Sequence, residues 1–519
     1  MLKISNRQQF TNYVLLIGAI LVVLNLVAYN LFGRLDLTDN SIFTLSQSSR
    51  DVIGKLDSKL TAKAYFSGTI PGAAANSRRY LQDMLEEYQA YSAGNFKFEF
   101  VDPDEDEKAQ QQAQTYGIPP VQLQVVENDK LEIKNVYMGL VLLFRDKKEP
   151  IPVIQSTQGL EYNLTATIKK LTATNLKNVG LISPESEEIS TQNLSRFLEQ
   201  IYSIRQTTLT TDIPDDVTTL ILNGFTDSLK SEELYRLDQF IMRGGHVFIG
   251  QSSIKDFLQQ GFAMEIKSNI FDFLKHYGVN IGKDLVIDQK CSQIQMQSQQ
   301  GFFTMRTAVD YPALPMIQRF NPDHILTKHM AVMKVFFVSE VSPVEEGGFL
   351  TTPLMYTSEH TGLISGPFFQ IHPTQSPAMK IFPYGPKSIA LLVEGPAKSY
   401  FSDSSGYSSR PGYIGANPNV RLIAIGDNQF FNDRRAGGVQ ENMDFILNAV
   451  DYLSGDEELI QIRSRDLTQR PLETLSDASR RSWKWFNLGM PVVLVLLMGI
   501  FKWRGTRMRR KILEDLYAK

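Results

Sequence analysis

The sequence has a single cysteine, Cys291, among 519 residues, which excludes an internal disulfide and a cysteine-based zinc site. It also lacks a basic excess. Its 53 Lys and Arg against 56 Asp and Glu give a formal net charge of −3, which argues against nucleic acid as a partner. No G-x-x-x-x-G-K-[ST] motif occurs. The chain therefore has no P-loop with which to hydrolyse ATP, and energy for any transport must come from another protein.

Residues that could carry catalysis are scattered rather than clustered. Cys291 lies in a Gln-rich stretch without the flanking glycines of a nucleophile elbow, and no G-x-S-x-G serine motif is present. His324 and His329 are five residues apart, which does not place them on one helix face as H-E-x-x-H does. The acidic run 102–107 lacks the spacing of a calcium loop, and we expect Asp104 to cap the helix that follows. The sequence thus predicts no catalytic residue, no metal site and no cofactor.

Two long apolar runs lie near the ends of the chain, at residues 13–32 and 486–503. Each is close to the roughly 20 residues that cross a bilayer as a helix. Lys and Arg are more frequent on the terminal sides of the two runs than on the flanks that face the middle of the chain. This asymmetry predicts that both termini are cytoplasmic and that the region between the runs faces outward. The first run could instead be a signal peptide, but it is long for one and no small-x-small cleavage site follows. We predict two membrane spans.

Small and polar residues in these runs mark positions where membrane helices can pack closely. Asn25 lies in the first run, and Gly489 and Pro491 lie in the second. The tail 504–519 is basic next to the membrane and then mildly amphipathic. That pattern suits contact with anionic lipid headgroups or with a membrane protein, so we expect membrane lipid to be one partner.

Residues 55–174 are expected to form one α/β domain. Alternating and helical apolar spacing gives the element order β-α-β-α-β-β-α, which is the order of a thioredoxin-like domain. Pro119 and Pro120 precede the predicted third strand, where that fold keeps a cis-proline. The loop after the first strand contains no cysteine, so the C-x-x-C redox motif is missing. We predict a thioredoxin-like scaffold without redox chemistry.

A second pattern runs through residues 175–462, where strand candidates alternate with helix candidates. This alternation predicts a doubly wound parallel sheet covered by helices on both faces. The pattern loosens over about 292–388, a stretch rich in Gln, Pro, Gly and Ser, which we interpret as an insertion within the domain. The remaining predicted segments are a cytoplasmic N-terminus (1–12), the first span (13–32), a linker (33–54), a second linker (463–485), the second span (486–503) and a cytoplasmic tail (504–519).

The best ligand-site candidates follow the predicted strand 421–426. They are Asp427 and Asn428, with Asp433 nearby. In open α/β sheets, ligands bind beyond the carboxyl ends of the strands, and these are polar side chains at such an end. The alternative is that Asp427 and Asn428 only shape the strand-to-helix turn through Asx hydrogen bonds. The sequence leaves both interpretations open.

An ordered set of motifs along the chain resembles the GldG family of bacterial ABC transporter auxiliary proteins. The matching pieces are GRLDLTDNSIFTLSQSSRDVIGKL (33–56), FVDPD (100–104), YGIPP (116–120), GLEYNLTATIKKLT (159–172), LDQFIMRGGHVFI (237–249), HYGVNIGKDLVIDQ (276–289), YPALP (311–315), NPDHILTKHM (321–330), RLIAIGDNQFFND (421–433) and ENMDFILNAVDYLSGDEELIQIRSR (441–465). No single piece is a catalytic signature. Their order and their spread over most of the chain make the resemblance specific.

The resemblance implies a non-catalytic accessory subunit in the bacterial inner (cytoplasmic) membrane, working with a multi-span permease and a cytoplasmic P-loop ATPase. In gliding bacteria such systems are tied to motility and adhesin secretion, so a polymer or a secreted protein is the implied substrate. It also implies that the second domain is class I amidotransferase-like, of a type shared with intraflagellar-transport and oligosaccharyltransferase subunits. Two alternatives stay open: a glycan- or polymer-binding module that needs no transporter, and a membrane-tethered hydrolase.

Overall fold

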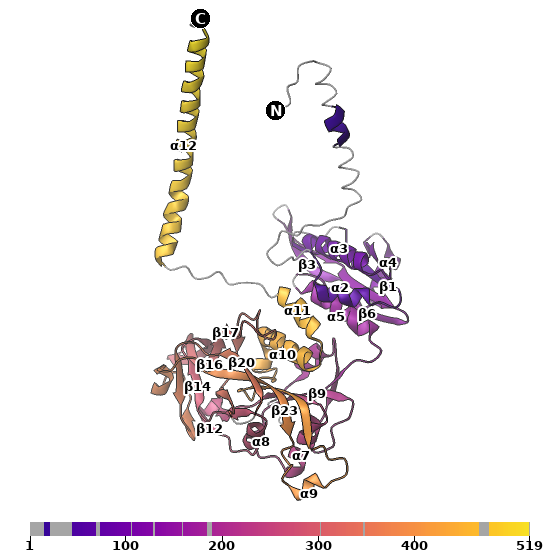
Figure 1. Ribbon diagram of the computed structural model, residues 1–519, viewed down its shortest axis with the longest axis vertical. Helices are drawn as coiled ribbons and strands as arrows, with labels where there is room; N and C mark the ends of the chain where they lie inside the picture. Colours follow the sequence, from indigo (N-terminus) through magenta and orange to yellow (C-terminus); the bar gives the residue numbers. More distant parts are fainter. Residues whose placement is uncertain are drawn as a thin grey trace. The chain divides into compact units, whose positions relative to one another are not determined.

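The structure is a computed structural model that describes residues 15–20, 44–68, 73–104, 106–127, 130–157, 159–183, 189–300, 303–345, 348–466 and 477–517. The chain divides into two compact units, Met1–Thr468 and Gln469–Lys519. The first unit contains an N-terminal α/β domain and a larger α/β domain, and the second contains one long helix (Figure 1). The predicted mixed α/β class is therefore confirmed.

The N-terminal domain is built on a four-stranded sheet in the order β2-β1-β5-β6. β1 is parallel to β2, whereas β5 is antiparallel to both β1 and β6. The elements are α2 (Gln47–Gly54), β1 (Leu60–Phe66), α3 (Ala73–Tyr91), β2 (Phe96–Val101), α4 (Glu107–Thr115), β3 (Val121–Glu127), β4 (Lys130–Val136), β5 (Met138–Phe144), β6 (Lys147–Ile151) and α5 (Leu160–Thr172). α2 falls within the stretch 33–54 that the sequence suggested as a linker.

Two local expectations in this domain are corrected. The predicted third and fourth strands, β3 and β4, form a separate two-stranded sheet, so Pro119 and Pro120 precede that hairpin instead of the third strand of the main sheet. The reason is that β5 is apolar on both faces and suits a central position, whereas β3 alternates apolar and polar residues. Asp104 does not cap α4. Its Oδ1 accepts from Ser67 Oγ at 3.0 Å, and Asp106 is the N-cap, accepting from the backbone N–H of Lys108.

The larger domain has an eight-stranded sheet in the order β17-β20-β23-β24-β10-β9-β7-β8. The five strands from β24 to β8 are parallel, and β23, β20 and β17 extend the sheet with antiparallel pairs. The elements are β7 (Asn178–Ile182), α6 (Gln192–Leu198), β8 (Ser203–Gln206), β9 (Val217–Leu222), α7 (Ser231–Met242), β10 (His246–Gly250), α8 (Ile270–His276), β17 (Arg319–Phe320), β20 (Leu350–Tyr356), β23 (Ser388–Lys398), α9 (Ser405–Ser408), β24 (Ala416–Ile425), α10 (Gln440–Leu453) and α11 (Glu457–Asp466).

The expectation of a parallel sheet is therefore wrong for β23, the strand that the sequence placed in this sheet next to β24. A parallel neighbour needs a crossover connection, usually through a helix, and the connection from β23 to β24 contains only the four-residue helix α9. The two strands consequently pair antiparallel. β17 and β20 lie inside the stretch 292–388 that the sequence suggested as an insertion, so part of that stretch belongs to the main sheet.

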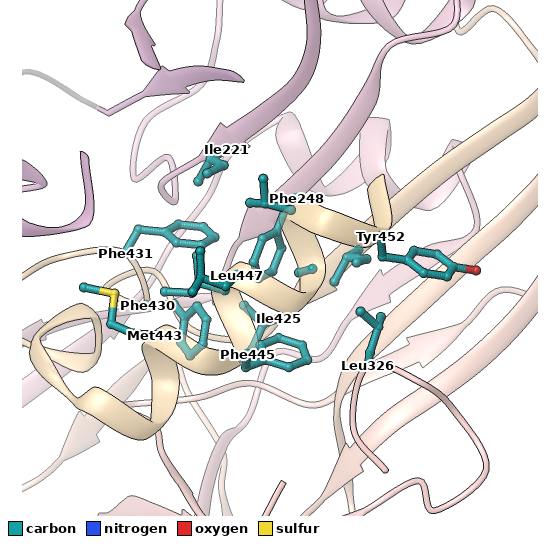
Figure 2. Close-up of a cluster of buried hydrophobic side chains, with 14 of the residues drawn as sticks. Ile221, Phe248, Leu326, Ile425, Phe430, Phe431, Met443, Phe445, Leu447 and Tyr452 are labelled. Carbon is teal, nitrogen blue, oxygen red and sulfur yellow. The ribbon is translucent and has the colours of Figure 1, made fainter. Parts of the chain in front are cut away.

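Helices cover both faces of this sheet, as the alternation predicted. Phe248 of β10 and Ile423 of β24 belong to a buried cluster with α6, α10 and α11. Their chain neighbours Val247 and Leu422 point to the opposite face and pack with α7 and α8. Figure 2 shows the first cluster, in which the Phe248 ring lies 4.8 Å from that of Phe431 and nearly perpendicular to it. The carboxyl ends of the parallel strands are thus held rigidly between two apolar layers.

A set of short strands forms a β module beside the main sheet, with its own apolar cluster. Its longest feature is the hairpin of β15 and β16. The elements outside the main sheet are β11 (Ile254–Phe257), η1 (Leu258–Gln260), β12 (Phe262–Glu265), β13 (Val279–Ile281), β14 (Leu285–Asp288), β15 (Cys291–Gln300), β16 (Phe303–Ile317), β18 (Met333–Lys334), β19 (Val341–Pro343), β21 (Thr361–Ile364), β22 (Phe368–Gln370), η2 (Pro377–Lys380) and η3 (Ala436–Gly438).

The second unit is the helix α12 (Asp477–Tyr517). Its 41 residues make it about 60 Å long. Among the described residues, one helical stretch, Ser479–Arg509, is long and apolar enough to cross a membrane, and it contains the predicted second span. α12 begins inside the predicted linker 463–485, because no helix-breaking residue separates that polar stretch from the apolar run. The first predicted span lies outside the described residues except for 15–20, which are helical.

Candidate functional site

The predicted ligand residue Asp427 follows β24 at the carboxyl end of the parallel strands. Gly426 precedes it because a Cβ there would lie 2.1 Å from the carbonyl oxygen of Ser339. The Asp427 side chain is fully buried, and both of its oxygens accept backbone N–H groups. Oδ1 accepts from Gln429 at 2.7 Å and Oδ2 accepts from Phe336 at 2.9 Å. The first of these bonds is the Asx turn that the alternative interpretation anticipated.

The charge state of Asp427 is set by its burial. Burial raises the pKa of Asp427 to about 7, and the two backbone hydrogen bonds and the more distant Arg435 only partly oppose this effect. A carboxyl group near its titration point at neutral pH is suited to exchange a proton. Its two oxygens, however, already accept the N–H groups that position the chain around it.

Asn428, the second predicted ligand residue, ties two strand ends together. Its Oδ1 accepts from the backbone N–H of Ser252 at 2.6 Å and from Gln251 Nε2 at 3.2 Å. Its Nδ2 donates to the carbonyl oxygen of Ile254 at 2.8 Å. A Cβ on Gly224 would lie 2.4 Å from Asn428 Oδ1, so this amide is packed closely against the chain that leaves β9. The amide therefore joins the ends of β24, β10 and β9.

Asp433, the third predicted ligand residue, is bonded to the first turn of α6. Its Oδ2 accepts from the backbone N–H of Asn193 at 2.8 Å and from Ser190 Oγ at 3.1 Å. Its Oδ1 accepts from the backbone N–H of Leu194 at 3.1 Å. A carboxylate in this position satisfies free N–H groups of the first helical turn and interacts favourably with the helix dipole. The structure places all three predicted residues at the carboxyl end of the parallel strands, each with protein partners, and ligand binding there stays a prediction.

A neighbouring residue that sequence reasoning missed is Asn223, directly after β9. The strand order β8-β7-β9-β10-β24 reverses its direction between β7 and β9, which is the switch point at which open α/β sheets bind ligands. Asn223 is fully buried, and its Nδ2 donates to Ser183 Oγ at 2.8 Å. Its Oδ1 has no hydrogen-bond partner in the part of the chain that the structure describes. An unsatisfied buried acceptor at a switch point is a second candidate for ligand contact.

A second buried polar cluster, also missed from the sequence, joins the two globular domains. Arg463 of α11 donates through Nη2 to Tyr162 OH of α5 at 2.5 Å and to Asp451 Oδ2 of α10 at 2.7 Å. It also donates through Nη1 to Asn448 Oδ1. The guanidinium carbon lies 4.3 Å from the centroid of the Tyr162 ring. Arg463 therefore touches the N-terminal domain and the larger domain at once, although the sequence suggested that a polar linker begins there.

Burial opposes charge within this cluster, and the ion pair restores it. Burial raises the pKa of Asp451, and Arg463 partly lowers it again. Burial likewise disfavours the charge on Arg463, but Tyr162 and Asp451 outweigh that effect and raise its pKa above the usual value. The guanidinium thus stays charged, and this buried charge is stabilised by partners from two domains.

The rim of the cluster adds further bonds between the same two domains. Asp456, which follows α10, accepts from Lys169 Nζ of α5 at 2.7 Å and, within the larger domain, from Lys177 Nζ at 2.8 Å. Lys169 Nζ also bonds Glu458 Oε1 at 2.6 Å. Tyr202 OH donates to Asp451 Oδ1 at 2.6 Å, inside the apolar cluster that α10, α11 and α5 share. Both charged and apolar contacts therefore bind α5 to α10 and α11.

Comparison with known proteins places the chain in a family. Residues 176–449, more than half of the chain, match the family described as "ABC-type uncharacterized transport system" (ABC_transp_aux). The chain belongs to this family of ABC transport system auxiliary proteins. Residues 39–143 match a domain of unknown function, DUF7088. An uncharacterized protein of Borreliella burgdorferi is 23% identical over 500 residues, covering 92% of this chain and 94% of the relative.

Two solved structures are also similar to this ABC transport auxiliary protein. The mmIFT52 N-terminal domain is 14% identical and has a TM-score of 0.32, covering 53% of this chain and 97% of its own. A putative ThuA-like protein of Parabacteroides merdae is 10% identical and has a TM-score of 0.27, covering 59% of this chain and 94% of its own.

Within the described residues, no group of three or more His, Cys, Asp or Glu side chains is arranged to hold a metal ion. Burial raises the pKa of the Cys291 thiol to about 11, which keeps it protonated at neutral pH. The predicted packing residues Gly489 and Pro491 lie in α12, and no atom outside its own helix lies within 4 Å of a Cβ placed on Gly489. Asn25 lies outside the described residues.

Proposed function

We propose that this chain is a non-catalytic, membrane-anchored accessory subunit of a bacterial ABC transporter, of the GldG type that serves gliding motility and secretion. The observation that carries the proposal is the place of α11 in the chain. Among the described residues it is the last helix before α12, and Arg463 on it bonds both globular domains. A helix that holds both domains and precedes a candidate membrane anchor in the chain suits a subunit that transmits movement.

The energy and the path of that movement come from partners. The sequence contains no P-loop, so a separate cytoplasmic ATPase hydrolyses ATP and drives a multi-span permease. The permease contacts α12 near Gly489 and Pro491, and contacts the first span near Asn25, because small and polar residues favour close helix packing in lipid. A shift of α12 then reaches both outer domains through α11. The outer domains recruit or guide the substrate, a polymer or a secreted protein.

We place the chain in the inner membrane with two spans, both termini cytoplasmic and residues 33–485 outside. The large apolar side chains of α12 are exposed along its length, as at Val495 (69%), Met498 (71%) and Phe501 (71%). A bilayer or the helices of a permease would cover them. Arg504 and Arg507 follow this apolar stretch, which supports a cytoplasmic C-terminus in contact with anionic lipid.

The strand orders support the finer assignment of both domains. In the N-terminal sheet, β1 pairs with a parallel β2 on one side and an antiparallel β5 on the other, as in the thioredoxin-like topology. The loop after β1 contains no cysteine, so in this proposal the domain serves as a scaffold without redox chemistry. In the larger domain the order β8-β7-β9-β10-β24 is that of a doubly wound sheet, consistent with an amidotransferase-like fold. Its carboxyl edge, with Asp427, Asn428, Asp433 and Asn223, is our candidate for substrate contact.

Affinity purification of the tagged full-length chain in mild detergent, followed by mass spectrometry, tests the proposal. We expect a permease and a P-loop ATPase in stoichiometric amounts. A matched chain that ends after Asp466 lacks α12 and should lose both. Recovery of the full-length chain alone from well-solubilised membranes would contradict the proposal.

The second candidate function is a glycan- or polymer-binding module that needs no transporter. The unsatisfied Oδ1 of Asn223 favours it, since a ligand hydroxyl could donate to this acceptor. Binding of the full-length chain to a glycan array, lost in Asn223→Ala, would support this function. If no permease co-purifies and no glycan binds, both candidates fail.

A further inference from the structure

The β15–β16 hairpin presents an unusually long free sheet edge. β15 spans ten residues, against about five or six in a typical strand. In its three-stranded sheet the order is β15-β16-β18, and within the described residues β15 pairs with β16 alone. One side of β15 therefore carries backbone N–H and C=O groups that no described strand meets.

Beyond its first two residues, this edge lacks the features that normally prevent sheet edges from pairing. Natural edge strands carry Lys, Pro or bulges that block the approach of another strand. Residues 291–305 contain no charged residue and no proline, although 21% of the whole chain is charged. The register of β15 against β16 is regular except for one shift between Cys291 and Ser292. The edge is thus open to a partner strand. Because it carries no charge, it cannot form ion pairs with a charged partner.

In the middle of β15, polar and apolar side chains lie on opposite faces. Gln293 and Gln295 are exposed, whereas Ile294 and Met296 are half-buried. Ile294 packs against the apolar cluster of the β module. The middle of β15 therefore has one polar face and one partly covered face that carries Ile294 and Met296, with Ser292 and Ser298 on either side of this pair in the sequence.

The hairpin register shows which backbone groups face the free edge. Gln300 is opposite Phe303, and two residues connect them, so this pair closes the hairpin with mutual hydrogen bonds. Hydrogen-bonded and non-hydrogen-bonded pairs alternate along an antiparallel ladder. Ile294 and Met296 are an even number of residues from Gln300, so their backbone N–H and C=O groups bond β16. The N–H and C=O of Gln293 and Gln295 consequently point to the free edge.

We propose that β15 pairs antiparallel with β15 of a second copy of this chain, about a two-fold axis through Gln295. The backbone N–H and C=O groups that point to the free edge belong to odd-numbered residues, and they must bond the same groups of the other copy. The two partners in each pair are therefore an even number of residues apart, and one residue at the centre lies opposite its own copy. The register centred on Gln295 places Ile294 of each copy opposite Met296 of the other, which gives two apolar cross-strand pairs on the half-buried face. Centring on Met296 would instead place Ile294 opposite Ser298.

A second copy is the occupant that fits this edge best. A two-fold interface is self-complementary, and an uncharged strand meets an identical uncharged strand without repulsion. Anchoring by α12 confines copies to the same membrane, which raises their effective concentration near one another. The pairing forms a continuous sheet β16-β15-β15-β16 across the dimer and removes both free edges.

Cysteine cross-linking of the full-length chain in membranes tests the register. In a Cys291→Ser background the chain has no other cysteine, so Gln295→Cys introduces one reactive thiol on the exposed face. Two such thiols would lie about 5 Å apart at their Cβ atoms. The matched control is Gln293→Cys, whose two copies would lie roughly 14 Å apart along the strands. With a short bismaleimide, we expect a cross-linked dimer from Gln295→Cys and none from Gln293→Cys.

A proline substitution tests the backbone pairing itself. Gln295→Pro removes an N–H that points to the free edge and leaves the ladder with β16 intact. We expect loss of the dimer by mass photometry in nanodiscs, with unchanged thermal unfolding, whereas Gln295→Thr keeps the N–H and the dimer. Equal cross-linking at both positions, no cross-linking at Gln295→Cys, or a dimer that survives Gln295→Pro would each overturn the proposal.

Discussion

Two of the buried polar clusters in the described part of the chain find their hydrogen-bond partners in different ways. The cluster at the end of β24 satisfies Asp427 and Asn428 with backbone and amide groups of one domain. The cluster around Arg463 bonds both terminal nitrogens of a buried guanidinium to side chains from the two domains, while its Nε has no partner among the described residues. The first stabilises the turns of one sheet edge. The second makes each domain depend on the other, and that difference suggests which cluster transmits movement.

The largest effect is expected at Arg463. Arg463→Ala leaves Asp451 buried without its charged partner, which costs about 3–5 kcal/mol of unfolding free energy. Chemical denaturation of the full-length protein in detergent measures this loss. The matched control is Lys170→Ala, which breaks a partly exposed pair with Glu149 inside the N-terminal domain and should cost at most about 1 kcal/mol. Equal losses in the two variants would remove the distinction between the clusters.

The next effect is a pH dependence at Asp427. Its pKa in the folded protein is about 7, above the ordinary value of 3.8, so the folded state favours the protonated form. The stabilisation is fully present below about pH 4 and is lost as the pH rises through 7, with an amplitude of up to about 4 kcal/mol. Asp427→Asn should flatten the fall of stability between pH 4 and 8 in urea titrations.

A comparison residue sharpens this test. Burial raises the pKa of Asp444 to about 6, so Asp444→Asn should remove a smaller slope of the same sign. A steeper fall in Asp427→Asn than in the wild type would contradict the assigned direction.

A smaller effect is expected at Asn428. Asn428→Ala removes the acceptor for the Ser252 N–H and the donor to Ile254, and should cost about 1–3 kcal/mol of unfolding free energy. This loss should appear at every pH, unlike that of Asp427→Asn. A loss above 5 kcal/mol would place the β24 cluster on a level with Arg463.

The smallest effect is expected at Asn223. Asn223→Ala removes the bond to Ser183 and also the unsatisfied Oδ1, so the two changes offset each other to within about 1 kcal/mol. Thermal unfolding measures the change. A large destabilisation would mean that Asn223 holds the switch point together, and it would weaken its role as a ligand contact.

The sequence predicted best what apolar periodicity controls. The strands β1, β7, β9, β10 and β24 and the helices α3, α5, α7 and α10 all follow from runs with a clear period. β8 and β20 were missed because β8 is short and polar and β20 has one half-exposed end. Strand direction was also beyond the sequence, since it depends on the connections between the strands.

The interface around Arg463 could not be predicted because its residues look like a solvated surface. Residues 456–465 (DEELIQIRSR) are rich in charge, as an exposed surface would be. No local pattern shows that Tyr162, 301 positions before Arg463, covers the guanidinium. One weak signal was present in α10. Asn448 and Asp451 lie among its buried apolar residues, and polar groups in such a stripe require buried partners.

The most direct test of the account is calorimetric unfolding of the full-length chain in detergent. Because α11 bonds both domains, we predict that they unfold in one cooperative transition in the wild type. In Arg463→Ala that transition should separate into two, as each domain loses the partner that stabilises it. Two well-resolved transitions in the wild type, at temperatures that Arg463→Ala leaves unchanged, would contradict the claim that α11 makes the two domains one unit.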